Sequence, residues 1–291
     1  MNDLPKISIV TPNFNGAAYL EETILSVLGQ NYPNLEYIIV DGGSTDGSVE
    51  IIKKYQEQLH WWISESDTGL YDAIQKGFEK STGELMAWIN SDDMYHKNAF
   101  FTIAEIFSSF KQVNWLVGTV TSYDELGRTI FCGPSRSFSK FDFYNGDFKW
   151  LQQESVFWRR ELWIETGACL NTNLKYAADF ALWIKFFKND KLFVTDALIG
   201  GFRYRSVNQI SFEHLDDYLL EADKIIKSVT LTSAEKKALL NYKRLLKIIK
   251  VIKYLKFIRT DWMTERYRSK YFLVPPRIRF DRPSKRFILS N

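Results

Sequence analysis

The sequence predicts an α/β fold with a mostly parallel, Rossmann-like central sheet flanked by helices, followed by a basic helical tail. Two observations predict the sheet. Apolar, strand-like segments alternate with amphipathic, helix-like segments over residues 7–93. Polar and glycine-rich turns follow the strand-like segments. This pattern is typical of parallel sheets with right-handed crossovers, in which ligands bind beyond the carboxyl ends of the strands.

The individual elements follow from the spacing of apolar side chains. Residues 7–10 predict a buried strand, which we expect to end at Thr11-Pro12 because proline interrupts the ladder. The spacing of Leu20, Ile24 and Val27 predicts a helix with one apolar face. The order then continues with a strand at 35–40, a helix around 49–55, a short strand at 61–63, a helix at 70–81 and a strand at 85–89.

The polar tips of these strands, at 11–15, 41–44 and 90–93, should converge on one crevice. Asp92 and Asp93 would repel each other there unless a cation lay nearby, and Mg²⁺ or Mn²⁺ prefers carboxylate oxygens together with substrate phosphates. An acidic loop that caps the next helix is the alternative. Asp41 could accept a hydrogen bond from the imide N–H of a uracil, or it could belong to an ordinary turn.

Four motifs occur in order: SIVTPNFN at 8–15, VDGGSTDG at 40–47, ESDTGLYDA at 65–73 and TGELMAWINSDD at 82–93. Together they resemble the nucleotide-binding half of the family 2 glycosyltransferases, which have a GT-A fold. The last motif resembles the family's DxD-type metal motif, with Ser91 at the first position of the triplet. Gln75 stands where the family often has Asn, and neither departure should abolish metal binding because Asp93 remains.

The resemblance implies a role for each matching residue. Asp93 would bind the metal, Mn²⁺ or Mg²⁺, and Asp92 would contact the ribose or the sugar. Lys76 would approach the diphosphate or the wall of the nucleoside pocket. The other residues implied to bind the nucleotide are Thr11, Pro12, Asn15, Asp41 and Asp67.

The second half of the chain contains fewer landmarks. The segment KYAADFALW at 175–183 resembles the family's segment around its catalytic base, and QQESVFWRR at 152–160 resembles the strand that precedes it. Asp179 is therefore the candidate general base, with a helix N-cap as the structural alternative. Further on, Arg203 and Arg205 lie in a segment that resembles the one after the catalytic helix, and they could contact the diphosphate or lie on the surface.

The C-terminal part is strongly basic. Residues 221–291 contain 19 Lys and Arg against 6 Asp and Glu, a net charge of +13, whereas residues 1–220 carry 19 against 29, a net charge of −10. Within 239–259, cations recur every three or four residues between apolar pairs, which predicts an amphipathic helix lying in an anionic membrane interface. A helix docked on the catalytic domain or in a homo-oligomer is the alternative. Nucleic acid is not an expected partner, since the body is acidic.

These observations predict residues 1–220 as a GT-A catalytic domain, with 1–95 as its nucleotide-binding half and 96–220 as its acceptor half, and residues 221–291 as a basic amphipathic helical tail. The expected activity is inverting transfer of one hexosyl or N-acetylhexosaminyl unit from a nucleotide sugar, preferably a UDP-sugar, to a hydroxyl of a glycan or lipid-linked acceptor. The resemblance extends to enzymes of bacterial surface-polysaccharide biosynthesis. A non-catalytic nucleotide-sugar binder or scaffold is the alternative.

The sequence also bears on the compartment. Cys132 and Cys169 have neither zinc-site spacing nor the number that a disulfide framework needs, which favours a reducing environment. The first residues lack the pattern of a secretion signal, and no stretch approaches the roughly 20 apolar residues that would cross a bilayer. We therefore expect a cytoplasmic protein attached peripherally to the inner face of the cell membrane.

Overall fold

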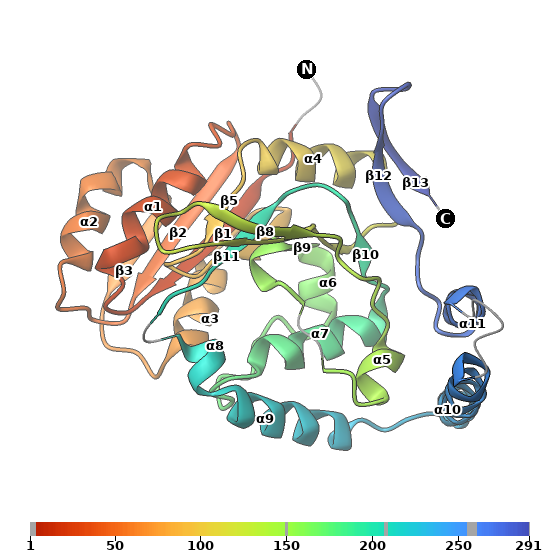
Figure 1. Cartoon of the computed structure of the whole chain (residues 1–291). Coiled ribbons are helices and arrows are strands. Elements are labelled where there is room, and N and C mark those ends of the chain that lie inside the picture. Colours follow the sequence, from red (N-terminus) through yellow and green to blue (C-terminus); the bar gives the residue numbers. More distant parts are fainter. Residues whose placement is uncertain (1–3, 149–150, 207–208, 255–260, 291) are drawn as a thin grey trace.

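The computed structural model of the chain describes residues 4–148, 151–206, 209–254 and 261–290. Within these residues the main sheet has seven strands in the order β10-β6-β9-β4-β1-β2-β3 (Figure 1). Only β9 runs antiparallel to its described neighbours β4 and β6, so the predicted mostly parallel sheet is confirmed. The strands are β1 (Ile7–Asn13), β2 (Leu35–Asp41), β3 (Trp61–Ser64), β4 (Leu85–Trp88), β6 (Trp115–Val117), β9 (Val156–Arg159) and β10 (Phe193–Val194).

Two apolar clusters, one on each face of the sheet, hold the helices in place. One cluster joins Ile7 and Ile9 of β1 to helices α1 (Ala17–Leu28), α2 (Ser48–Tyr55) and α4 (Ala99–Ser109). The other joins Val10 of the same strand to α3 (Leu70–Lys80), α6 (Arg160–Glu165), α7 (Ala178–Asn189) and α9 (Leu215–Ser228). This division follows the alternation of side chains along a strand. Much of the high aromatic content fills the second cluster, where Trp88 and Trp183 stack with ring centroids 5.7 Å apart.

The first strand is longer than the sequence predicts. β1 continues through Pro12 and pairs with β2 as far as Asn13 and Asp41. Pairing between β1 and β4 ends earlier, at Val10 and Trp88. Pro12 therefore lies where β1 is hydrogen-bonded on one side, so its missing N–H does not interrupt the ladder.

A second sheet lies beside the carboxyl end of β4. Its described strands follow the order β5 (Met94–Tyr95), β11 (Gly200–Arg203), β7 (Val120–Tyr123) and β8 (Thr129–Gly133). Because β5 begins directly after the Asp92-Asp93 pair and pairs with β11, this sheet brings Arg203 to the acidic motif. The remaining short elements of the described chain before the tail are helices α5 (Lys140–Tyr144) and α8 (Ile210–Glu213) and the 3₁₀ turns η1 (Gln56–Gln58) and η2 (Gln153–Ser155).

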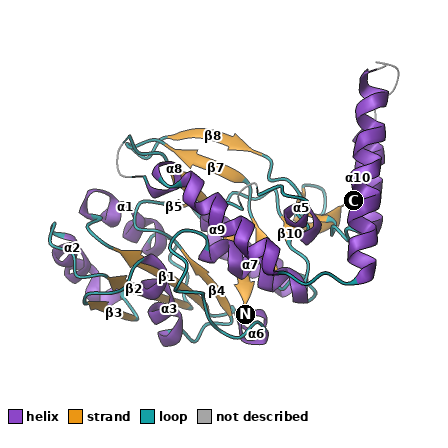
Figure 2. Ribbon diagram, turned by 90° about the horizontal axis from the view of Figure 1, so that it is seen from below, coloured by secondary structure: helices purple, strands orange, loops and turns teal. Residues whose placement is uncertain are grey.

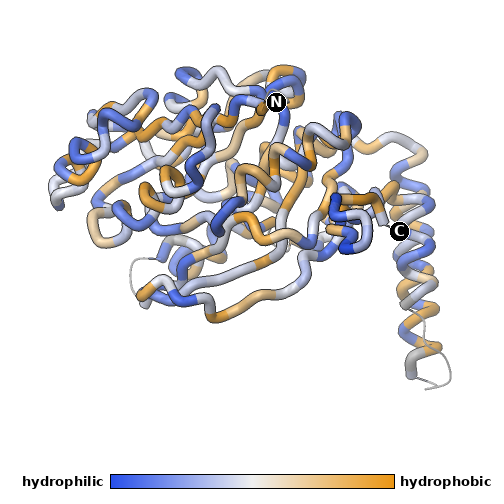
Figure 3. The backbone as a smooth tube through the Cα atoms, turned by 90° about the horizontal axis from the view of Figure 1, so that it is seen from above, coloured by the Kyte–Doolittle hydropathy of each residue, from blue (hydrophilic) through white to orange (hydrophobic). Residues whose placement is uncertain are grey.

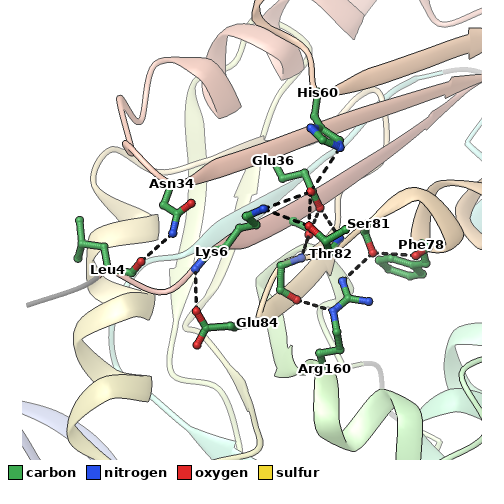
Figure 4. A network of polar contacts seen from close by, with 12 residues as sticks. Leu4, Lys6, Asn34, Glu36, His60, Phe78, Ser81, Thr82, Glu84 and Arg160 are labelled. Carbon is green, nitrogen blue, oxygen red and sulfur yellow. Dashed lines mark hydrogen bonds and ion pairs between the residues drawn. The ribbon is translucent and has the colours of Figure 1, made fainter.

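A buried polar network closes the opposite end of the main sheet (Figure 4). The Glu36 carboxylate accepts hydrogen bonds from the Ser8 hydroxyl at 2.5 Å and from the backbone N–H and hydroxyl of Thr82 at 2.6 and 2.7 Å. A Cβ atom on Gly83 would lie 2.4 Å from Ser8 Oγ and 2.7 Å from its backbone nitrogen, so the tight turn requires glycine. The TGE part of the fourth motif is thus structural and lies away from the acidic pair.

The tail differs from the expected helical extension. It contains α10 (Ser233–Tyr254) and α11 (Asp261–Tyr271), but it ends in a hairpin of β12 (Arg277–Asp281) and β13 (Arg286–Ser290). α11 ends at Tyr271, shortly before Leu273 adopts a left-handed φ of 53°, and Pro275-Pro276 then lead into a segment in which alternating residues such as Ile278 favour a strand. The boundary placed between 220 and 221 also needs correction, since it falls inside α9, whose apolar face packs in the core on one side of the main sheet.

One face of α10 is docked on protein. Leu239 and Tyr242 pack with Phe141 of α5 and with Phe272, and the Tyr242 and Phe272 rings lie 4.5 Å apart. The rest of α10 projects from the edge of the molecule (Figure 2), and hydrophobic and hydrophilic residues alternate along it (Figure 3). Residues 255–260 of the predicted amphipathic segment lie outside the described residues. No helix in the described part of the chain is long and apolar enough to cross a membrane.

Candidate active site

The tips of β1, β2 and β4 meet at one edge of the sheet, as predicted. Asn13 at the end of β1 donates a hydrogen bond from its side-chain amide to Asp41 Oδ1 at 2.6 Å. A Cβ atom on Gly16 would lie 2.3 Å from Asn13 Oδ1 and 2.8 Å from Ser91 Oγ. Gly16 therefore lies against both side chains, and since Ser91 precedes the acidic pair, the three tips meet around this glycine.

Asp41 is fully buried and its carboxylate is held by the surrounding loop. Ser44 donates from its hydroxyl to Oδ1 and from its backbone to Oδ2, and the Ser64 hydroxyl donates to Oδ2 at 2.6 Å. Burial alone would raise the pKa of Asp41, but these hydrogen bonds outweigh it and lower the pKa. The carboxylate is therefore an anionic acceptor, and a base N–H could reach it only by displacing one of these hydroxyl groups.

The other residues assigned to the nucleoside lie around these tips at different depths. Thr11 and Pro12 are buried, and the Thr11 hydroxyl is hydrogen-bonded to the Tyr37 hydroxyl at 3.0 Å, so both lie beneath the surface of the strand tips. Asn15 is exposed, has a positive φ of 49°, and accepts a hydrogen bond from the Thr45 backbone N–H. It is the best placed of the three to contact a ligand.

Asp67 and Lys76 border the same edge from α3 and the loop before it. Asp67 Oδ2 lies 2.8 Å from the position that a Cβ atom on Gly42 would occupy, so Gly42 allows the two loops to touch. Burial raises the pKa of Asp67. The Lys76 ammonium group lies 3.0 Å from Glu65 and 3.5 Å from Asp72, which places a partly exposed cation beside the β2 tip.

Asp92 and Asp93 differ in environment. Asp93 is fully buried, and its Oδ1 accepts the backbone N–H of Arg203 at 2.9 Å. Burial, followed by the charges of Asp92 and Glu154, raises the pKa of Asp93 well above its ordinary value. Asp92 is partly exposed and forms an ion pair with Arg205, whose Nε lies 2.9 Å from Oδ2. Burial raises the pKa of Asp92 as well, and the Arg205 guanidinium opposes this shift.

The structure corrects the expectation for Arg203. Its side chain is fully buried, and its guanidinium donates to the backbone oxygens of Asp92 and Glu125 and to the Glu22 carboxylate at 2.6 Å. The guanidinium carbon also lies 4.9 Å from the centre of the Tyr19 ring. Because Nε and both terminal nitrogens have protein partners, Arg203 fixes the acidic motif against α1, and a diphosphate could reach its guanidinium only by displacing one of them.

The oxygen atoms around the acidic pair suit a divalent cation that also binds phosphate. Asn90 Oδ1 and Glu154 Oε1 are buried without a hydrogen-bond partner in the described part of the chain. Burial raises the pKa of Glu154 to about 7, and the charge of Asp92 adds to this shift. Among the described residues, no group of three or more His, Cys, Asp or Glu side chains forms a complete metal site. In Mg²⁺ sites of nucleotide-binding enzymes, one or two carboxylates together with the substrate phosphates bind the ion.

Asp179 lies in the first turn of α7, where Ala177 occupies the N-cap position. Its Oδ1 accepts the backbone N–H of Phe180 at 2.7 Å and faces the Tyr71 hydroxyl at 3.3 Å. Burial raises the pKa of Asp179 to about 6, although these two hydrogen bonds oppose the shift. A carboxylate with a pKa near neutrality has the basicity that a general base needs.

Tyr71, Glu154 and Glu221 received no functional role from the sequence. Tyr71 and Glu154 lie in segments that resemble the family. The signal that could have identified them is an ionisable side chain among apolar neighbours. Glu221 gave no local signal. Its carboxylate accepts hydrogen bonds from the backbone N–H groups of 175–177, a contact that exists only because α9 packs on α7.

Comparison with known protein families matches residues 8–193 to Glycosyl transferase family 2. The putative teichuronic acid biosynthesis glycosyltransferase TuaG of Bacillus subtilis is 38% identical over 97 residues, which cover 32% of this chain and 38% of TuaG. An uncharacterized glycosyltransferase of Rickettsia prowazekii is 26% identical over 194 residues, which cover 65% of this chain and 61% of that protein. The chain thus spans less than two thirds of the length of these curated relatives.

Solved structures show the same fold. TarS 1–349 of S. aureus in complex with UDP-GlcNAc matches with a TM-score of 0.64 and 20% identity, covering 81% of this chain and 70% of that one. The mannosyltransferase PcManGT of Pyrobaculum calidifontis, in complex with GDP-Man and Mn²⁺, matches with a TM-score of 0.58 and 16% identity, covering 79% and 67%. With a family match over more than half of its residues and this fold, the chain belongs to glycosyltransferase family 2 and has the GT-A architecture.

Proposed function

We propose that this protein transfers a single sugar, with inversion, from a nucleotide-sugar donor to a hydroxyl group of a glycan or lipid-linked acceptor. The observation that carries the proposal is a continuous path of contacts between two groups of carboxylates. At the β2 tip, Gly42 lies so close to Asp67 that a Cβ atom on the glycine would be 2.8 Å from Asp67 Oδ2. Helix α3 begins three residues after Asp67. In the first turn of that helix, Tyr71 reaches Asp179. A donor held at the strand tips would therefore lie beside the candidate base.

In this mechanism Asp179 removes the proton from the acceptor hydroxyl as its oxygen attacks the anomeric carbon. The new glycosidic bond forms as the bond between that carbon and the diphosphate oxygen breaks, and the electron pair leaves with the nucleoside diphosphate. Arg205 and Lys76 supply positive charge near the departing group. A divalent cation held by Asp93 and Asp92 would neutralise further charge on the diphosphate.

Support for the substrate class comes from the relatives and neighbours. TuaG is named for teichuronic acid biosynthesis, and TarS was solved with UDP-GlcNAc, which favours a UDP-sugar donor, an N-acetylhexosaminyl or hexosyl unit and a role in surface-polysaccharide synthesis. The anionic Asp41 carboxylate could accept the imide N–H of uracil if the base displaced the Ser44 or Ser64 hydroxyl group. PcManGT was solved with GDP-Man, so GDP and dTDP sugars belong in any donor screen.

Calorimetry with UDP, GDP and dTDP, each with and without Mn²⁺, tests donor binding. We expect the tightest binding for UDP with Mn²⁺, and we expect Asp93→Asn to abolish most of the metal-dependent part. Glu105→Asn, on α4, is the control for an unrelated acidic side chain. Equal UDP affinity with and without metal in both proteins would refute the metal role. Nucleotide-sugar binding without any donor hydrolysis or transfer would favour the non-catalytic binder or scaffold.

We further propose that the tail holds the protein at the inner, cytoplasmic face of the cell membrane. The exposed side of α10 presents Ile248 and Val251, which are 54% and 61% exposed, together with Lys243, Arg244 and Lys247. Exposed apolar side chains beside cations suit an anionic bilayer surface, where each cation adds about 1 kcal/mol. The part of α10 that is free to meet a membrane is smaller than the sequence predicts, because Leu239 and Tyr242 are buried against protein.

Deleting the tail would not test this proposal cleanly, since Ile278, Phe287 and Leu289 of the hairpin pack in the main core. Ile248→Asn with Val251→Asn leaves that packing intact. Leu219→Asn with Leu220→Asn, at exposed positions of α9, is the matched control. We expect wild type and control to sediment with phosphatidylglycerol vesicles at low salt and the α10 variant to remain soluble. If all three proteins remain in the supernatant, the membrane proposal is wrong.

A further inference from the structure

The turn that presents Asp179 is held by a residue from outside the matched family segment. Glu221 Oε1 accepts the backbone N–H of Lys175 at 3.0 Å. Its Oε2 accepts those of Tyr176 at 2.9 Å and Ala177 at 2.8 Å. The carboxylate thus binds the backbone immediately before Asp179, and its own position lies beyond residue 193, where the family match ends.

This contact fixes the backbone that leads into α7. Ala177 is the N-cap residue of α7 and has no side-chain oxygen that could hold the helix start. Glu221, from another helix, instead binds the N–H groups of the three residues before the first helical residue, and its negative charge lies near the positive end of the α7 dipole. Without it, three backbone donors in a part-buried turn would lose their hydrogen-bond partner.

Other residues on the same side of α9 hold the same turn. At the start of α9, the His214 ring stacks on Tyr176 with centroids 4.6 Å apart, and Tyr218 contacts Phe180 edge-to-face at 6.3 Å. With Glu221, these residues are spaced four and three positions apart, as expected for one helix face. The groups that face Asp179 are therefore Tyr71 from α3 and Tyr218 and Glu221 from α9.

We propose that Glu221 is a positioning residue of the active site, which fixes the 175–177 backbone and through it the Asp179 carboxylate. This inference rests on the proposed role of Asp179 as general base. It also assigns a function in the reaction to the first part of the segment that the sequence places in the tail. The negative charge of Glu221 acts on Asp179 as well, because it favours the protonated form of that carboxyl group.

The test compares Glu221→Gln with Asp223→Asn, which lies on the same helix in a surface pair with Lys227. Donor turnover is measured from pH 4.5 to 8 with the nucleotide sugar that the calorimetric screen selects. Glu221→Gln should lower kcat about tenfold or more with little change in donor KM, and it should move the acidic limb of the profile to lower pH. Asp223→Asn should leave both unchanged. An unchanged kcat and acidic limb in Glu221→Gln would overturn the proposal.

A second measurement needs no turnover. The free energy of unfolding is measured at pH 5 and 7.5 for wild type, Asp179→Asn, Glu221→Gln and the double variant, and the coupling between the two positions is taken from this cycle. The coupling should be larger at pH 7.5, where Asp179 is ionised. Equal coupling at both pH values would refute the proposed interaction between Glu221 and the ionised Asp179 carboxylate. If wild type turns over no donor, the proposed function fails. The cycle still shows whether Glu221 and Asp179 are coupled.

If Glu221→Gln does not fold, Glu221→Asp replaces it. The shorter side chain keeps the charge but withdraws the carboxylate from the 175–177 backbone. It should lower kcat and leave the acidic limb in place. Wild-type kcat in this variant would show that the hydrogen bonds to 175–177 do not position Asp179.

Discussion

The hydroxyl of Tyr71 lies 3.3 Å from Asp179 Oδ1 and donates a 2.9 Å hydrogen bond to the carbonyl oxygen of Tyr176. Tyr71 belongs to α3 in the half of the chain that the sequence predicts to bind the nucleotide, whereas Asp179 lies in the first turn of α7 in the other half. One buried side chain thus joins the two halves at the candidate base. This arrangement couples the position of the donor-side helix to the basicity of Asp179.

Replacing Tyr71 with Phe should change the pH dependence of turnover. The Tyr71 hydrogen bond lowers the pKa of Asp179, so its loss should raise that pKa further and shift the acidic limb to higher pH. The loss of hydrogen bonding should also cost about 1 kcal/mol of stability. Tyr55→Phe is the control, since the Tyr55 hydroxyl also binds a carboxylate, that of Glu21, away from the site. An acidic limb that shifts equally in both variants would contradict this prediction.

Asp179→Asn should bind donor normally but transfer sugar more slowly by a factor on the order of 10²–10⁴. The substitution should also stabilise the protein at neutral pH. The pKa of Asp179 is about 6 in the folded protein and about 3.9 in the unfolded chain. The stability that this carboxyl group contributes is therefore fully present below about pH 3.9 and is lost as the pH rises through about 6. Relative to wild type, the variant should gain up to about 3 kcal/mol between pH 4 and 7.5.

Chemical denaturation at several pH values measures this gain, and donor calorimetry checks that the site is intact. A variant that is less stable than wild type at every pH would show that Asp179 mainly holds the start of α7. Near-normal turnover would lead to the same conclusion.

Arg203 and Arg205 should respond differently to the same substitution. Arg203→Gln leaves Glu22 and two backbone oxygens without their partner, and we expect it to destabilise the protein by about 2–4 kcal/mol. Arg205→Gln should cost less stability but should weaken UDP binding severalfold. Each variant serves as the control for the other in denaturation and calorimetry. Reversed effects would mean that Arg203 is the residue that contacts the donor.

Glu36→Gln should destabilise the fold without affecting the site. Burial alone would raise the pKa of Glu36, but hydrogen bonds from Ser8 and Thr82 outweigh it and lower the pKa. The stability that Glu36 contributes should therefore be present above its unfolded-state pKa of about 4.3 and be lost as pH falls through the lower folded-state value. At pH 7 we expect a loss of about 1–3 kcal/mol and unchanged UDP affinity.

Glu50→Gln, at an exposed position of α2, is the matched control and should unfold like wild type. Weaker UDP binding by Glu36→Gln would contradict the structural role that the network in Figure 4 indicates.

Local sequence was sufficient to predict most strands and helices of the first 95 residues. It also predicted the edge of the sheet at which the polar strand tips meet. Strand and helix periods are local properties, and the carboxyl ends of parallel strands must lie at one edge, so the meeting of Asn13, Asp41 and Ser91 followed from the order of elements. The family followed from motifs whose spacing is also local. Even here β1 was placed too short, because the effect of Pro12 depends on where β4 leaves the sheet.

Only the tertiary structure decided which charged groups act on one another. Arg203 and Arg205 are nearly adjacent and chemically identical, yet Arg203, the last residue of β11, is buried, whereas Arg205, just beyond the strand, pairs with Asp92. The sequence places Glu221 in a basic tail. In the structure α9 packs on α7 and brings the Glu221 carboxylate to the backbone of 175–177. The apolar face of α10 could meet lipid or protein, and the packing of Leu239 and Tyr242 assigns part of it to protein. Burial and long-range pairing fix these roles, and neither is a property of a residue's neighbours in sequence.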